Sequence, residues 1–238
     1  TPSSEGRNIA IGDGALRNAV TPNNNIAMGT DAASGITGNF NIALGAYANS
    51  VSNSPGAVTA NNTIAIGERA RASSTNAIAQ GNRTTASGGA AIAVGANANA
   101  TGGYAIAQGY ATQATGISSI AIGGAQNVPN QTRATATYAT AIGFAANAGA
   151  SGAIAIGREA NHDVNGQNAD PNKTTSTDRN KTTGADSIAI GTKTNASATN
   201  AMSLGTSSQA TGANAIAQGT YANAGASGAI AMGVRANA

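Results

Sequence analysis

The chain has 238 residues and a formal net charge of only +3, and its 12 Lys and Arg residues are scattered along it, which argues against a nucleic-acid-binding surface. Charged residues make up 9% and aromatic residues 3%, so large side chains are too few for a thick layered core. With 41% apolar residues the chain is not disordered by composition either. The remaining possibility is a regular structure with a thin interior.

A phrase of the form Ile-Ala-x-Gly recurs along the chain and predicts its strands. The first residue is Ile in twelve of fourteen copies, the second is Ala in thirteen, and the third is Ile, Leu, Val or Met in eleven. Such alternation in a β-branched-rich segment is typical of a β-strand. In chain order the copies close at Gly12, Gly29, Gly45, Gly67, Gly81, Gly95, Gly109, Gly123, Gly143, Gly157, Gly191, Gly205, Gly219 and Gly233.

The spacing of these glycines sets a period of 14 residues, which eight of the thirteen intervals share. Longer intervals indicate insertions near 46–63, 124–140 and 158–187, and no 14-residue interval contains Pro, as expected of hydrogen-bonded ladders. A second alternation, Ala-x-Ala, follows the Gly in many copies and predicts a second short strand. Two strands and two turns form one rung, so we expect a single all-β domain, 1–238, folded as a β-solenoid of about fourteen parallel rungs.

The simplest packing sets the central Ala of the phrase against the Ala-x-Ala of the second strand. The large side chains of the phrase then form a stripe of 24 apolar residues outside the roll. Contiguous apolar surface marks interfaces, so we expect self-association about a common axis, although periodicity does not choose between two and three chains. A monomeric roll with Ile inside is the alternative, but it leaves Ala-x-Ala without a partner.

This packing assigns residues to the two sides of the first strand. The expected axis residues are Ile64, Ile66, Ile78, Gln80, Ile92, Val94, Ile106, Gln108, Ile120, Ile122, Ile216 and Gln218. The expected interior residues are Ala65, Ala79, Ala93, Ala107, Ala98 and Ala100. The three glutamines would be buried amides, which need partners, so we expect inter-chain or water-mediated hydrogen bonds that set register and chain number.

The phrases "NNTIAIGERARASS", "GGAAIAVGANANATG" and "GADSIAIGTKTNASATN" resemble the head repeats of YadA-like trimeric autotransporter adhesins of Gram-negative bacteria. The resemblance runs from Asn8 to Ala238. It implies a left-handed parallel β-roll, a homotrimer, display on the bacterial surface and adhesion to host extracellular matrix or cells. We expect the stalk and the outer-membrane anchor of that family to lie outside this segment, because the segment has no sustained heptads.

The longest insertion carries the candidate partner-binding residues Arg158, His162, Lys173, Arg179 and Lys181. Solenoid insertions map to surface loops that often bind partners, but a weakly constrained hydrophilic loop explains the composition equally well. His162 is the only His, and no catalytic set, phosphate loop or metal-ligand spacing accompanies it. We therefore expect no enzyme activity and no cofactor. The alternative function is a non-catalytic solenoid that binds a repetitive lattice such as ice, mineral or glycan.

Overall fold

The computed structural model describes residues 6–19, 23–50, 59–124, 131–158 and 184–238. In these ranges every regular element is a β-strand, and accordingly they contain no helix of the length and apolarity that a membrane crossing requires. The chain divides into two compact units, Thr1–Tyr110 and Ala111–Ala238, and both are built in the same way.

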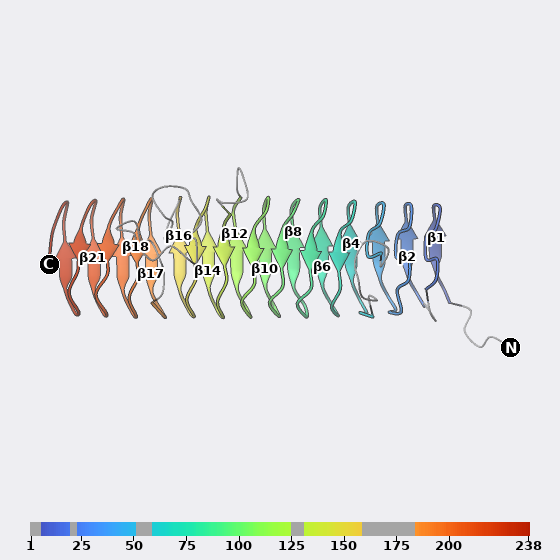
Figure 1. The fold of residues 1–238 in the computed structure, drawn as a ribbon, viewed down its shortest axis with the longest axis horizontal. Coiled ribbons are helices and arrows are strands. Elements are labelled where there is room, and N and C mark those ends of the chain that lie inside the picture. Colours follow the sequence, from blue (N-terminus) through green and yellow to red (C-terminus); the bar gives the residue numbers. More distant parts are fainter. Residues whose placement is uncertain (1–5, 20–22, 51–58, 125–130, 159–183) are drawn as a thin grey trace, which may run out of the picture. The chain divides into compact units, whose positions relative to one another are not determined.

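In the first unit the Ile-Ala-x phrase forms seven three-residue strands. Neighbouring strands pair in parallel and in register, so that Ile lies beside Ile and Ala beside Ala in successive rungs (Figure 1). The strands are β1 (Ile9–Ile11), β2 (Ile26–Met28), β3 (Ile42–Leu44), β4 (Ile64–Ile66), β6 (Ile78–Gln80), β8 (Ile92–Val94) and β10 (Ile106–Gln108). Three two-residue strands, β5 (Arg71–Ala72), β7 (Thr85–Ala86) and β9 (Asn99–Ala100), form a second parallel ladder.

The second unit repeats this arrangement with seven strands of the first kind. They are β12 (Ile120–Ile122), β14 (Thr140–Ile142), β16 (Ile154–Ile156), β17 (Ile188–Ile190), β19 (Met202–Leu204), β21 (Ile216–Gln218) and β23 (Ile230–Met232). Its second ladders are β11 (Gln113–Ala114), β13 (Arg133–Ala134) and β15 (Asn147–Ala148), and β18 (Asn195–Ala196), β20 (Gln209–Ala210) and β22 (Asn223–Ala224). The described chain is thus an all-β parallel solenoid of about thirteen turns, which confirms the predicted class of fold.

The Gly that closes each phrase is required by close approach of the next rung. Gly81 has a φ of +135°, a backbone conformation that residues with a side chain rarely adopt. A Cβ atom placed on it would lie 2.7 Å from both the carbonyl carbon and the carbonyl oxygen of Gly95. The repeated Gly therefore reflects a column of backbone contacts between rungs as well as a turn.

The interior of the roll is made almost wholly of Ala. The central Ala of the phrase is fully buried in β4, β6, β8 and β10, and so are both alanines that flank Asn99. Among the described residues Ile36 is the largest side chain that is fully buried. Such an interior contributes little hydrophobic free energy per rung, so neighbouring rungs and covering surfaces must supply the rest.

The first rungs have a different interior, because β1, β2 and β3 are followed by turns instead of a described second strand. In the turns that precede β2 and β3, Asn25 and Asn41 are buried and form a ladder from rung to rung. The backbone N–H of Asn41 donates to Asn25 Oδ1 at 2.8 Å, and the backbone N–H of Thr63 donates to Asn41 Oδ1 at 2.9 Å. The amide of Asn41 also donates to the Ala60 carbonyl at 3.0 Å. In the regular rungs the equivalent N–H bonds to a carbonyl of its own turn, as the N–H of Ala77 does to the Ser74 carbonyl at 3.1 Å, so here the asparagine side chain takes the place of that turn bond.

A hydroxyl pair compensates the one copy of the phrase with Ser at its centre. Ser203 and Ser208 are both fully buried, and their Oγ atoms lie 2.7 Å apart. Ser208 Oγ also donates to the Gly205 carbonyl at 3.3 Å. Ser203 is therefore tolerated in the row of buried alanines, because Ser208, five residues later and next to the second strand, provides its hydrogen-bond partner.

Candidate functional site

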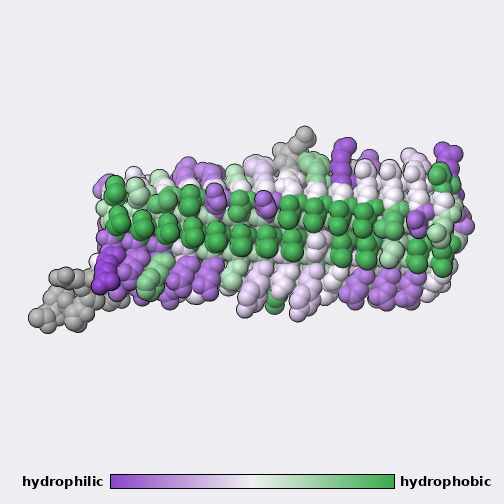
Figure 2. All heavy atoms as spheres, turned by 180° about the vertical axis from the view of Figure 1, so that it is seen from behind, coloured by the Kyte–Doolittle hydropathy of each residue, from purple (hydrophilic) through white to green (hydrophobic). Residues whose placement is uncertain are grey.

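The largest feature of each unit is an apolar face made by the first and third residues of the strand phrase. These side chains point away from the alanine interior, and they form green rows that cross the rungs in Figure 2. Ile66 is 36% exposed and Ile190 42% exposed in the single chain, whereas the alanines between the rows are fully buried. Each of the twelve predicted axis residues lies on the apolar face of its own unit and is half-buried or exposed: Ile64, Ile66, Ile78, Gln80, Ile92, Val94, Ile106 and Gln108 in the first unit, and Ile120, Ile122, Ile216 and Gln218 in the second.

The rows are continuous because the rungs stay in register. In the first unit Ile78 is the register partner of Ile64 on one side and of Ile92 on the other. Parallel strands lie about 4.8 Å apart, which brings these side chains into van der Waals reach of one another. The six predicted interior residues, Ala65, Ala79, Ala93, Ala107, Ala98 and Ala100, are fully buried behind this face.

Glutamine interrupts the second row of the face at three places. Gln80 lies in register between Ile66 and Val94, and Gln108 follows Val94. The side-chain amides of Gln80, Gln108 and Gln218 are exposed, and in the described part of the chain none of them forms a hydrogen bond. Each amide therefore keeps its donors and acceptor available to groups outside the chain.

The second strands present a polar row on the opposite side of the rung, which sequence reasoning did not single out. This row consists of Arg71, Thr85 and Asn99 in the first unit, and of Gln113, Arg133, Asn147, Asn195, Gln209 and Asn223 in the second. The sequence does contain a pattern that could have predicted this row, namely the polar residue between the two alanines of Ala-x-Ala. Each rung is thus amphipathic, with one apolar and one polar outer face.

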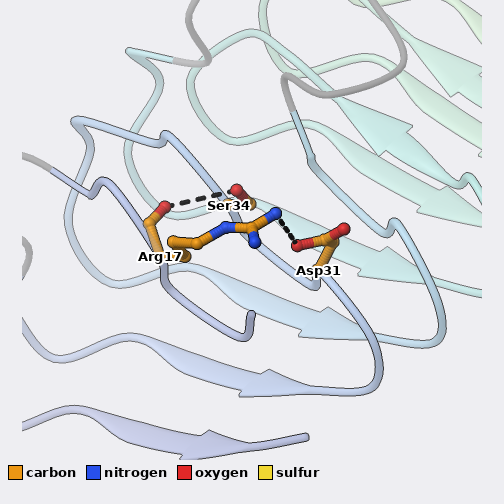
Figure 3. A network of polar contacts seen from close by, with 3 residues as sticks. All are labelled: Arg17, Asp31 and Ser34. Carbon is orange, nitrogen blue, oxygen red and sulfur yellow. Dashed lines mark hydrogen bonds and ion pairs between the residues drawn. The ribbon is translucent and has the colours of Figure 1, made fainter. Parts of the chain in front are cut away.

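The turns carry most of the charged side chains, and one ion pair joins the first two rungs. Arg17 Nη2 donates to Asp31 Oδ1 at 2.6 Å, and Ser34 Oγ donates to the Arg17 carbonyl at 3.2 Å (Figure 3). The Arg17 side chain is 55% exposed, so solvent screens the pair and its contribution to stability is small. This cluster ties two turns together and leaves no unpaired charge.

The insertion residues can be placed only in part. Arg158 is exposed at the end of a described range, and its carbonyl accepts the backbone N–H of Lys193 at 3.1 Å. The other four candidates, His162, Lys173, Arg179 and Lys181, lie outside the described residues. Within the described ranges no three His, Cys, Asp or Glu side chains come together in a group that could hold a metal ion.

The structure is a β-solenoid of repeated amphipathic rungs. Its candidate functional features are its outer faces, one apolar and one polar. A family model described as the YadA head domain repeat, in two copies, matches six stretches that together cover more than half of the chain. They are residues 59–84, 72–98, 100–125, 134–160, 183–208 and 210–236. The chain therefore belongs to the YadA head domain family, as the repeat phrases indicated. No curated protein matches the chain. Membership suggests a trimeric autotransporter adhesin, and this family and fold are typically non-catalytic.

Proposed function

We propose that the chain is the head of a homotrimeric adhesin, displayed on the bacterial cell surface, that attaches the cell to host extracellular matrix or to host cells. The observation that carries the proposal is the apolar face, which the single chain leaves uncovered over successive rungs. Membership of the YadA head family supports the same assembly and location.

Burial of the apolar face on association would contribute a large favourable free energy. The phrase places 24 apolar side chains on it, and complete burial of one aliphatic side chain contributes about 1.5–3 kcal/mol. Because these side chains are already partly covered in the single chain, the available gain is smaller than a full sum. It still reaches tens of kcal/mol in order of magnitude, which favours obligate association over a free monomer.

Three chains around one axis suit the chemistry of this face. Cyclic symmetry closes the assembly and lets identical rows meet one another. Gln80, Gln108 and Gln218 then form rings of three amides near the axis, where their free donors and acceptors can pair between chains. Such rings fix the register of the chains, because a slip by one rung would set each amide against aliphatic side chains.

Attachment in this proposal depends on repetition. A trimer presents each polar face and each turn three times, and weak contacts at each copy combine into strong overall binding. The host partner is a matrix protein or a cell-surface receptor. The insertion that begins at Arg158 is one candidate contact, and the turns of the regular rungs are another.

The test is an attachment assay with the purified chain. Fluorescently labelled trimer is added to surfaces coated with collagen, fibronectin or laminin and to cultured host cells, with albumin-coated wells as the control. We expect saturable binding to at least one matrix protein or to cells. A deletion of twenty residues within 158–187, which restores the 14-residue interval between Gly157 and Gly191, decides in the same assay between the loop and the regular rungs. Binding to none of these surfaces would contradict the proposed function, whatever the mass of the assembly.

A further inference from the structure

Three arginines gather in two neighbouring rungs of the first unit, at the turn that follows the phrase Gly and on the second strand. Arg69 and Arg83 occupy the same place in successive repeats, and the backbone N–H of Arg83 donates to the Glu68 carbonyl at 2.8 Å. Arg71 lies two residues after Arg69, and its backbone N–H donates to the Thr84 carbonyl at 2.8 Å. These bonds hold the three residues in adjacent rungs, as one basic cluster of Arg69, Arg71 and Arg83.

The basic cluster is only partly neutralised. Glu68 is its one acidic neighbour, and its two carboxylate oxygens accept bonds from Arg69 Nη1 at 3.0 Å and from Asn82 Nδ2 at 3.1 Å. The guanidinium groups of Arg71 and Arg83 have no hydrogen-bond or ion-pair partner among the described residues. Among the described residues the pair of Glu68 with Arg69 is thus the only ion pair of the cluster.

An aromatic ring extends the cluster on the side of the preceding rung. The guanidinium carbon of Arg69 lies 5.5 Å from the centre of the Tyr47 ring, within the range of a cation–π contact. Arg69 and Arg83 also adopt positive φ angles of 56° and 53°, which cost more for Arg than for Asn or Gly. The same turn position has a positive φ in other repeats, as at Asn97 and Lys193, so this strain belongs to the turn and is not particular to the arginines.

We propose that the basic cluster binds a sulfated glycosaminoglycan of the host surface, and this inference rests on the proposed role of the chain as an adhesin head. Guanidinium groups recognise planar and tetrahedral oxyanions through paired charge-assisted hydrogen bonds. Rungs about 4.8 Å apart present these groups at short intervals along the surface, and a linear polysaccharide offers sulfates and carboxylates at short intervals along its length. The ring of Tyr47 provides a flat surface beside the charges.

The charge distribution favours this occupant over nucleic acid. The chain as a whole carries a formal net charge of only +3, so it lacks the extended basic surface that follows a duplex backbone. A local cluster repeated three times in a trimer instead suits a flexible polyanion that can reach several copies.

The experiment measures the affinity of the trimer for a short, size-defined heparin oligosaccharide by fluorescence anisotropy at about 150 mM salt, where long-range attraction is screened. The triple variant R69Q/R71Q/R83Q should weaken binding by about tenfold or more, since each charge-assisted bond contributes more than one neutral bond. The matched control R133Q/K193Q/R235Q removes the same charge at equivalent repeat positions that are not in neighbouring rungs, and it should leave the affinity within about twofold. E68Q should tighten binding, because it releases Arg69.

The proposal is overturned if wild-type trimer does not bind the oligosaccharide, or if the two triple variants lose affinity equally. It is also overturned if chemically desulfated heparin or single-stranded DNA binds as tightly and with the same dependence on the cluster. A cell assay separates this proposal from the adhesin function. Attachment that persists after enzymatic removal of cell-surface glycosaminoglycans rejects the glycosaminoglycan and keeps the adhesin, whereas absence of attachment to every surface rejects the adhesin.

Discussion

Single residues in this roll are constrained mainly by the backbone of the next rung. Gly81 has no room for a Cβ atom, because the carbonyl group of Gly95 occupies the space. Gly89, in the other turn of the same repeat, has no atom within 4 Å of the equivalent position. The two glycines therefore separate the effect of rung contact from the general effect of removing a Gly.

Gly81→Ala should destabilise the roll by more than the about 1–3 kcal/mol expected from a strained backbone alone, because the new methyl group also displaces the neighbouring rung. Gly89→Ala should be neutral or stabilise by roughly 0.4–1 kcal/mol, since it only restricts the unfolded chain. Thermal unfolding followed by circular dichroism compares the two. Equal unfolding midpoints for both variants would show that the close contact between Gly81 and Gly95 does not require a glycine.

The buried hydroxyl pair gives a second prediction for single residues. Ser208→Ala leaves the Ser203 hydroxyl buried without its only described partner and should cost about 1–3 kcal/mol. Ser203→Ala should cost less, because Ser208 keeps its bond to the Gly205 carbonyl. The double variant should be no less stable than Ser208→Ala. Urea unfolding of the four proteins measures the coupling, and additive losses would contradict the pairing.

Among the structural elements, the asparagine ladder connects the turns that precede the strands of the first rungs. Asn41→Leu should destabilise these rungs by about 2–4 kcal/mol in total, because it removes the acceptor of the buried Thr63 N–H and the donor to the Ala60 carbonyl. Hydrogen exchange should accelerate at β2, β3 and β4 and remain slow at β8 and β10. Asn97→Ala, at a turn in a regular rung, is the control, and uniform acceleration along the unit would contradict a local ladder.

The sequence predicts the regular rungs well, because period and pattern agree in each copy. Ile92, Ala93 and Val94 alternate between the two sides of a strand, and the fixed period places each of them beside its equivalent. The ladder of Asn25, Asn41 and Thr63 was not predictable in the same way. Its members are 16 and 22 residues apart, so they follow irregular intervals, and Asn in such a context indicates a turn. Their burial depends on the contact of each turn with the turn of the next rung, which only the fold reveals.

For the whole molecule, association through the apolar face leads to a prediction of mass. Wild-type chain should scatter light as a particle of about three times 22.8 kDa. The variant Ile78→Lys with Ile92→Lys should scatter as a single chain, because two neighbouring lysines from each chain cannot be buried at an axis without partners. The alanine interior is untouched by these changes, so the circular dichroism spectrum should persist.

The control for this prediction places the same charges on the polar face of the same rungs. Thr85→Lys with Asn99→Lys puts two lysines in register, as Ile78 and Ile92 are, and one of them lies beside Arg71, so repulsion within one chain is at least as large. This control should keep the larger mass. A wild-type monomer, or loss of assembly in both variants, would show that the apolar face is not the site of association.

The column of glycines has a consequence for how such a protein changes over generations. Within each unit, successive rungs meet through the same contact of Gly with Gly, and in regular copies the strands meet in the same register of Ile with Ile and Ala with Ala. A gene that gains or loses one unit of fourteen codons keeps its reading frame and joins two rungs whose surfaces already fit. The length of the protein can therefore change by gain or loss of whole rungs, while the contacts between neighbouring rungs remain the same.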